Sequence, residues 1–272
     1  MTATPSSVPP LNEPPAPLHP WNRDFTWTPR RGPFRRLTDA DGVRFDTDGY
    51  AVLRGALPAG LVDEARAVID ELVAADEAEL AGRGGRAGIS EVGAITFAAH
   101  LVTRSEVLRS FVRDEVLCEV AADLLGPDVN LYWDQAVYKR PEKPRRFPWH
   151  QDNGYTFVEP QHYLTCWIPL VPATPDNGCP QVAVGAHRFG TLAHHYVDPL
   201  GWECFTEPPS PPAVVPVDPG DVLVFSSLTP HLTGPNVSDE VRKAYIVQYA
   251  PAGAEVLRGD PAEGAGHRPD PV

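Results

Sequence analysis

The second half of the chain is divided into short strand-like segments, and this pattern limits the fold more than any other feature of the sequence. From Val129 onward, short runs rich in Val, Ile, Tyr and Trp alternate with turns that contain Pro, Gly and Asp. The predicted strands are 130–139, 146–151, 163–170, 180–184, 213–217, 221–226 and 243–250. Many short strands with turn signals are typical of a sandwich or barrel, and a double-stranded β-helix (jelly roll) fits this pattern best.

Helical periodicity precedes these strands. Apolar residues within 61–73, and again within 107–124, recur at the spacing of one helix face. Gly126 and Pro127 predict the end of the second helix. Residues 45–53 read as a turn followed by a short strand. We therefore expect a mainly β fold with flanking helices, which pack on one sheet of the jelly-roll core.

Composition divides the chain into one domain and two tails. Residues 1–40 are rich in proline and predict a partly disordered arm, whose aromatic residues, such as Trp21 and Trp27, pack on the domain surface. Residues 41–255 predict a single jelly-roll domain, and residues 256–272 a flexible tail.

Charge and apolar content exclude several classes of function. The net charge of -13 argues against nucleic-acid binding, which depends on a basic surface. There is no apolar run of about 18 residues and no signal-peptide pattern, so we expect neither a membrane span nor export. The four cysteines lack paired spacing and predict reduced thiols in the cytoplasm. We expect a cytoplasmic monomer or homodimer.

One group of residues has the pattern of a metal site. His150 and Asp152 are two residues apart, His231 follows 79 residues after Asp152, and Arg242 follows eleven residues after His231. On a β-strand, His150 and Asp152 would point to the same face. Two imidazoles and one carboxylate on one side of a metal are typical of non-heme Fe(II) oxygenases. Because the chain has nine histidines, this spacing alone is a weak signal.

Further motifs strengthen the interpretation. They are Trp149-His150-Gln151-Asp152-Asn153 and the segments 165–170, 176–188 and 219–225, followed by His231 and Arg242. In order and spacing, the chain from about Phe45 to Pro251 resembles the phytanoyl-CoA dioxygenase family. The resemblance implies a jelly-roll fold that binds Fe(II), with 2-oxoglutarate and dioxygen as co-substrates.

The resemblance also implies roles for individual residues. His150, Asp152 and His231 would bind Fe(II), while Arg242 and Thr233 would hold the distal carboxylate of 2-oxoglutarate. Gln151 and Trp167 fall at family positions near the co-substrate, although Trp167 is equally a candidate for a core aromatic residue. On the preceding strand, Gln135 or Tyr138 would contact the co-substrate.

The function this implies is hydroxylation of an unactivated C–H bond in a small-molecule metabolite, with release of succinate and carbon dioxide. The composition is typical of bacteria that use this family in secondary metabolism. Two alternatives remain open. A cupin-type metal enzyme that does not use 2-oxoglutarate would have no need of Arg242, and a non-catalytic jelly-roll binding protein would turn over no 2-oxoglutarate.

A basic stretch lies just before the metal motif. Five positive charges occur within eight residues, at Lys139, Arg140, Lys143, Arg145 and Arg146. One interpretation is a cavity mouth for an anionic substrate, such as a coenzyme A ester or a carrier-bound acid. The other is a solvated loop between strands, and the sequence leaves both open.

Overall fold

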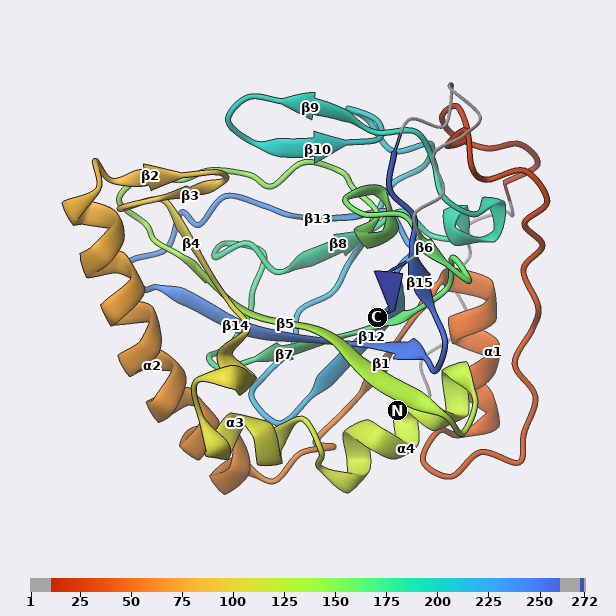
Figure 1. Cartoon of the computed structure of the whole chain (residues 1–272), viewed down its shortest axis with the longest axis horizontal. Coiled ribbons are helices and arrows are strands. Elements are labelled where there is room, and N and C mark those ends of the chain that lie inside the picture. Colours follow the sequence, from red (N-terminus) through yellow and green to blue (C-terminus); the bar gives the residue numbers. More distant parts are fainter. Residues whose placement is uncertain (1–10, 260–269, 272) are drawn as a thin grey trace.

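Eight antiparallel strands form the main sheet of the protein (Figure 1). The computed structural model describes residues 11–259 and the backbone of residues 270–271. In spatial order the strands are β1 (Tyr50–Leu53), β12 (Val222–Ser226), β7 (Leu164–Pro169), β14 (Arg242–Pro251), β5 (Val129–Lys139), β4 (Ile95–Ala99), β3 (Ser90–Glu91) and β2 (Arg86–Ala87).

A smaller sheet faces the main one and completes the jelly roll. It consists of β11 (Ala213–Val214), β8 (Pro180–Val182) and β13 (His231–Thr233). Between the two sheets lies an apolar layer that includes Val182 and Val215 from the small sheet side and Leu223 and Phe225 from β12. A hairpin of β9 (His195–Val197) and β10 (Gly201–Glu203) and a third group of β6 (Val158–Glu159), β15 (Glu255–Val256) and β16 (Asp270–Pro271) lie beside them. The predicted jelly-roll core is therefore confirmed.

Helices cover the opposite face of the main sheet (Figure 1). They are α1 (Asp39–Asp48), α2 (Ala59–Gly82), α3 (Glu106–Phe111) and α4 (Glu115–Leu125), and the short 3-10 segments are η1 (Leu101–Thr103), η2 (Asp152–Gly154) and η3 (Ala186–Phe189). In α2, Val62, Ala65, Ile69 and Val73 recur at helical spacing and are buried in the core. This apolar face is what fixes α2 on the sheet.

The helices differ from the sequence prediction in two ways. The single helix predicted over 107–124 is two helices, because Asp114 caps α4 by accepting a hydrogen bond from the backbone N–H of Val116. The first helix, α1, was not predicted. It is mostly polar and is defined by a capping box between Thr38 and Asp41 and by Gly49, which ends it at φ 87°.

The predicted strand 146–151 is wrong. That stretch contains an isolated bridge between His150 and His231 and two single backbone hydrogen bonds, from Phe147 N–H to Thr233 and from Cys204 N–H to Trp149, but no continuous ladder. Pro144 precedes the segment and Pro148 lies within it, and neither has the N–H that a strand ladder requires. The chain therefore crosses from the main sheet to the metal motif as a loop.

The arm packs its aromatic residues against the domain. Trp27 donates a hydrogen bond from Nε1 to Asp46 (3.1 Å), and its ring lies edge-on to His187 with 4.4 Å between centroids. Trp21 meets Phe157 in the same manner at 5.5 Å. This confirms the predicted packing. The tails were also predicted to be partly disordered, but residues 1–10 and 260–269 lie outside the described part of the chain.

Candidate active site

A cavity of about 320 Å³ opens between the main sheet and the β13 region. Three paired strands, β7, β14 and β5, form the floor of the cavity. Because side chains alternate between the two faces of a sheet, every second residue of these strands faces the cavity. The facing residues form two cross-strand rows, Trp167–Ile246–Gln135 and Thr165–Gln248–Trp133. Intervening residues such as Cys166, Tyr245 and Ala136 face the helices.

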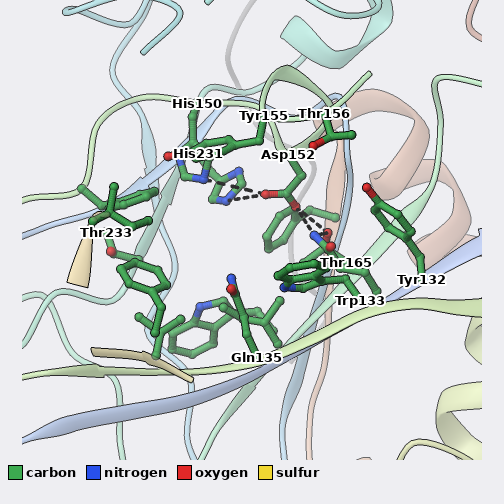
Figure 2. Close-up of a pocket in the computed structure, with 18 of the residues that line it drawn as sticks. Tyr132, Trp133, Gln135, His150, Asp152, Tyr155, Thr156, Thr165, His231 and Thr233 are labelled. Atoms are coloured by element: carbon green, nitrogen blue, oxygen red, sulfur yellow. Dashed lines mark hydrogen bonds and ion pairs between the residues drawn. The ribbon is translucent and has the colours of Figure 1, made fainter. Parts of the chain in front are cut away.

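Three potential metal ligands meet at the cavity wall. Nε2 of His150 lies 3.7 Å from Oδ1 of Asp152, and Nε2 of His231 lies 3.8 Å from the same oxygen (Figure 2). His150 and His231 exchange backbone hydrogen bonds of 3.0 and 2.9 Å, which brings their side chains together. Asp152 follows at the first residue of η2 rather than on a strand. The group converges as predicted, but a bridge and a helical turn position it.

Hydrogen bonds set the orientation of both imidazole rings. Nδ1 of His150 lies 2.8 Å from the carbonyl oxygen of Pro148, and Nδ1 of His231 lies 3.0 Å from that of Thr229. A ring that donates from Nδ1 presents the Nε2 lone pair, here toward Asp152. Burial, with a contribution from His231, holds the pKa of His150 well below its usual value. A neutral imidazole is the form that binds a metal.

Asp152 uses its two oxygens differently. Oδ2 accepts hydrogen bonds from the Thr165 hydroxyl (2.5 Å) and the Gln248 amide (2.9 Å), as Figure 2 shows for Thr165. Oδ1 remains directed at the two histidines. Thr165 and Gln248 therefore orient the carboxylate so that one oxygen is available to a cation. We did not predict either residue, although alternation along the strand places Thr165 on the same face as Trp167.

Arg242 lies buried at the start of β14, on the same cavity. Only 1% of it is exposed, and its three guanidinium nitrogens have no hydrogen-bond partner among the described residues. The guanidinium carbon lies 5.3 Å from the centroid of the Trp167 ring. Burial lowers the pKa of Arg242 to about 10, so it is still charged at neutral pH. A buried unpaired charge is unfavourable, and this geometry fits an anionic ligand with oxygens directed at the guanidinium.

Lys139 is a second buried basic residue, and it lies opposite Arg242 in the register of β5 and β14. Its Nζ donates hydrogen bonds to the carbonyl oxygens of Thr233 (2.8 Å) and Gly234 (2.6 Å). Burial first, and then the charges of Arg242 and Arg145, hold the pKa of Lys139 well below its usual value. Lys139 thus fixes the end of β13 where Thr233 enters the cavity, and it is not part of an exposed basic patch.

The other residues implied by the family resemblance divide into two groups. Thr233, Trp167 and Gln135 all line the cavity. Tyr138 faces the helices, where its hydroxyl donates to Asp70 (2.5 Å), so Gln135 is the residue of that pair on the cavity.

Gln151 does not line the cavity. Its amide donates to the carbonyl oxygens of Gly190 (2.9 Å) and Leu228 (2.6 Å) and accepts from the backbone N–H of Leu192 (2.6 Å). Since both ends of this buried side chain are occupied, the interpretation of Gln151 as a co-substrate contact is wrong. Its structural effect is to hold the segment that carries His150 and Asp152.

The basic stretch before the metal motif is paired internally. Arg140 forms an ion pair with Glu77 on α2, and Arg146 pairs with Glu203 on β10 (3.0 Å). Lys143 and Arg145 both contact Glu91 on β3, at 3.2 and 3.4 Å. With Lys139 buried, each of the five cations has a partner within the protein. The four ion pairs connect the segment 140–146 to α2, β3 and β10, so these side chains do not form an unpaired basic surface at the cavity entrance.

The remaining histidines near the site have structural contacts. His187 is buried under Trp27, and burial lowers its pKa to about 3. His194 accepts a hydrogen bond from the backbone N–H of Gln151 (2.9 Å) through Nε2. His195 is exposed on β9. Of the described residues, only His150, Asp152 and His231 form a cluster of the kind that holds a metal ion.

A jelly roll that presents two imidazoles and one oriented carboxylate to a cavity has the ligand set of the non-heme iron oxygenases. The unpaired guanidinium on the same cavity adds a position at which an anionic ligand could bind. The chain belongs to the phytanoyl-CoA dioxygenase (PhyH) family, whose model matches residues 45–244. No helix in the described part of the chain is both long and apolar enough to cross a membrane.

Curated relatives support the family but differ in what they act on. A methylphosphonate hydroxylase from Gimesia maris is 30% identical over 151 residues, which are 52% of this chain and 53% of that protein. A 1-deoxypentalenic acid 11-beta-hydroxylase from Streptomyces arenae is 26% identical over 216 residues, 71% of this chain and 73% of that protein. The chain spans about half the length of the first curated relatives that it matches.

Solved structures share the fold. The carbocyclase SnoK from nogalamycin biosynthesis has a TM-score of 0.67 and 23% identity, and the match covers 87% of this chain and 93% of that one. EvdO2 from Micromonospora carbonacea var. aurantiaca, solved with 2-oxoglutarate, has a TM-score of 0.63 and 22% identity over the same shares. At 22–23% sequence identity, the similarity to these structures establishes the fold of this chain but not its function.

Proposed function

We propose that the chain is an Fe(II)- and 2-oxoglutarate-dependent dioxygenase that hydroxylates an unactivated C–H bond of a small molecule. The observation that carries this proposal is the unpaired guanidinium of Arg242, buried on the cavity that also holds His150, Asp152 and His231. A metal enzyme without a dianionic co-substrate would gain nothing from that charge and would bear its desolvation cost. This argues against a cupin-type enzyme.

In this proposal the two histidines and Oδ1 of Asp152 hold iron(II), and Arg242 holds the distal carboxylate of 2-oxoglutarate. A guanidinium fork matches a carboxylate with two parallel hydrogen bonds. The Thr233 hydroxyl adds a donor from the cavity wall, and the Trp167 ring packs against the guanidinium. Gln135 lies in the row of Trp167 on the cavity floor, and in this proposal its amide contacts the co-substrate.

Bound iron(II), with 2-oxoglutarate and dioxygen, supplies oxidative decarboxylation coupled to the insertion of one oxygen atom into a C–H bond, with succinate and carbon dioxide as products. The chain itself contributes position and the exclusion of water. Thr165 and Gln248 hold Asp152 in one orientation, and the apolar side chains of the cavity keep solvent from the reacting atoms. Asp152 in the ligand set supports hydroxylation rather than halogenation.

Secondary metabolism is the setting that we propose. Relatives named as hydroxylases of 1-deoxypentalenic acid and structures from nogalamycin biosynthesis support it, whereas the relatives named for methylphosphonate and 2-aminoethylphosphonate point to other small substrates. The names of these relatives all refer to small-molecule substrates, and we propose that this chain also acts on a small molecule.

The proposal is tested by measuring succinate production with purified chain, iron(II), 2-oxoglutarate and oxygen, without any primary substrate. Slow uncoupled formation of succinate is expected, and it should require iron(II). Iron binding without any consumption of 2-oxoglutarate would favour the cupin-type alternative. Absence of both would favour a binding protein that has no catalytic activity.

A further inference from the structure

Only one cationic side chain lines the cavity in the part of the chain that the structure describes. Among the described residues on its wall, Arg242 is the sole Lys or Arg, and the proposed function uses it for the co-substrate. A phosphate, phosphonate or coenzyme A group on the primary substrate would therefore enter without a counter-charge. Moving such an anion out of water is strongly unfavourable unless cations or several hydrogen-bond donors replace the solvent.

Cations around the cavity are committed elsewhere. Lys143, Arg145 and Arg146 pair with Glu91 and Glu203. At the rim, Arg86 pairs with Asp198 on the turn between β9 and β10 (3.5 Å). The charge of Arg258 acts on Tyr132, but Arg258 is exposed and does not line the cavity. An anionic substrate would compete with the carboxylates that Arg86, Lys143, Arg145 and Arg146 already contact.

One wall of the cavity is a continuous apolar cluster. It is made of Ile95, Val137 and Phe147, with Ile89, Phe97, Tyr155 and Ile246 packed against them. Ile89 lies on the turn between β2 and β3, and a Cβ on Gly201 of β10 would lie only 3.5 Å from its Cγ2. The two hairpins therefore approach each other over this wall. Such a surface favours the hydrocarbon part of a ligand through apolar burial.

Uncharged polar groups lie at the other end. In Figure 2, Tyr132 and Thr156 lie beyond Asp152, on the opposite side of the metal group from Thr233. Burial raises the pKa of Tyr132, so its hydroxyl stays protonated at neutral pH. Two neutral hydroxyls can donate to or accept from an alcohol or a carbonyl.

We propose that the primary substrate is an uncharged, largely apolar small molecule with a hydroxyl or carbonyl group that is held near Tyr132 and Thr156. Its hydrocarbon part contacts the cluster of Ile89, Phe97 and Phe147. Phosphates, phosphonates and coenzyme A esters are rejected because, with Arg242 occupied by 2-oxoglutarate, the described residues of the cavity wall offer them no further Lys or Arg. This inference rests on the proposed function, which reserves Arg242 for 2-oxoglutarate.

The test uses two ten-carbon alcohols, borneol and geraniol, each beside its own phosphate monoester. Binding is measured by calorimetry to protein loaded with iron(II) and 2-oxoglutarate in the absence of oxygen. We expect at least one alcohol to bind, and its monoester to bind at least about tenfold more weakly, because only the ester carries an unpaired charge into the cavity.

A variant sharpens this result. Ile89→Lys, at a half-buried turn position, adds an ammonium group to the apolar wall and should narrow or reverse the preference for the alcohol. The matched control is Val43→Lys on α1, which is 60% exposed and does not line the cavity, and it should leave the preference unchanged.

Tighter binding of the monoesters to the unmodified chain would overturn the inference, as would failure of every alcohol to bind. Neither result would touch the proposed function, which is judged separately by iron-dependent succinate formation without a primary substrate. Conversely, if the chain forms no succinate but still binds the alcohols more tightly than their monoesters, the proposed function is wrong and the inference about substrate charge still holds.

Discussion

Arg242 and Lys139 lie opposite each other in the register of β14 and β5, so that two buried basic side chains are neighbours. Lys139 donates to two carbonyl oxygens, whereas the guanidinium of Arg242 has no hydrogen-bond partner among the described residues. The repulsion between them contributes to the low pKa of Lys139. An anion bound to Arg242 would relieve this repulsion as well as pair the guanidinium.

Replacing Arg242 should weaken 2-oxoglutarate binding specifically. Loss of one partner of a buried charged pair costs roughly 3–5 kcal/mol, which is about two to nearly four orders of magnitude in affinity. Arg242→Ala should raise the apparent constant for 2-oxoglutarate by this amount, and Arg242→Lys by less, while the constant for iron changes little. Lys243→Ala is the control, because Lys243 is on the same strand and pairs with Asp70 on the helix side. An unchanged constant in Arg242→Ala would refute the assignment.

Removal of a proposed metal ligand should abolish metal binding without unfolding the chain. Asp152→Ala and His231→Ala should lose iron and succinate formation, as should the unmodified chain treated with a chelator. Ligand at 100 times its dissociation constant stabilises a protein by about 2.7 kcal/mol, so iron should raise the melting temperature of the unmodified chain but not of these variants. His195→Ala, at an exposed histidine on β9, should behave like the unmodified chain. Full iron content in both ligand variants would place the site elsewhere.

The hydrogen bonds to Asp152 predict a graded effect on metal affinity. Thr165→Val keeps the shape of the side chain but removes the donor to Oδ2, and Gln248→Met removes the other donor. Partners of metal ligands typically contribute roughly 10–100-fold in metal affinity, so each variant should bind iron less tightly by about that factor. Metal titration would measure it. Combined loss no larger than either single loss would show that the two donors act as one unit.

Neutralising lysines and arginines of the basic stretch should not weaken electrostatic attraction of the substrate. Lys143→Ala and Arg145→Ala remove partners of Glu91, and turnover of either variant should have the same dependence on salt as the unmodified chain. Instead, the β2–β3 hairpin should become more susceptible to limited proteolysis, because these pairs hold it to the loop. Arg140→Gln, whose partner Glu77 is on α2, is a control with no direct effect on that hairpin. A loss of capture that disappears at high salt would restore the anion-steering interpretation.

Strand alternation explains why much of the site was predictable. Trp167 and Gln135 reach the cavity because the strands around them pair with the register that their apolar pattern predicts. The same parity rule would have placed Lys139 on the inner face and Tyr138 on the outer one. The basic stretch alone does not show this difference, since the residue type of a lysine or arginine does not indicate whether its side chain faces inward or outward.

Other features depend on contacts that local sequence does not contain. Gln151 is adjacent to two metal ligands, but it is occupied by Gly190, Leu192 and Leu228, which lie far along the chain. His150 and Asp152 converge through a backbone bridge to a distant residue and a helical turn, not through a strand. The partners of the basic loop, such as Glu91, are set by how the hairpins fold over the cavity.

The backbone bridge between His150 and His231 also relates the site to the stability of the fold. His231 belongs to the small sheet, whereas Asp152 is tied to the main sheet through Thr165 and Gln248. A cation held by His150, Asp152 and His231 would therefore connect the small sheet to the main sheet. The small sheet could not open locally without releasing that cation. Amide hydrogens of β8 and β13 would then exchange more slowly in the metal-bound protein. Metal binding and local opening of the small sheet would therefore be thermodynamically coupled.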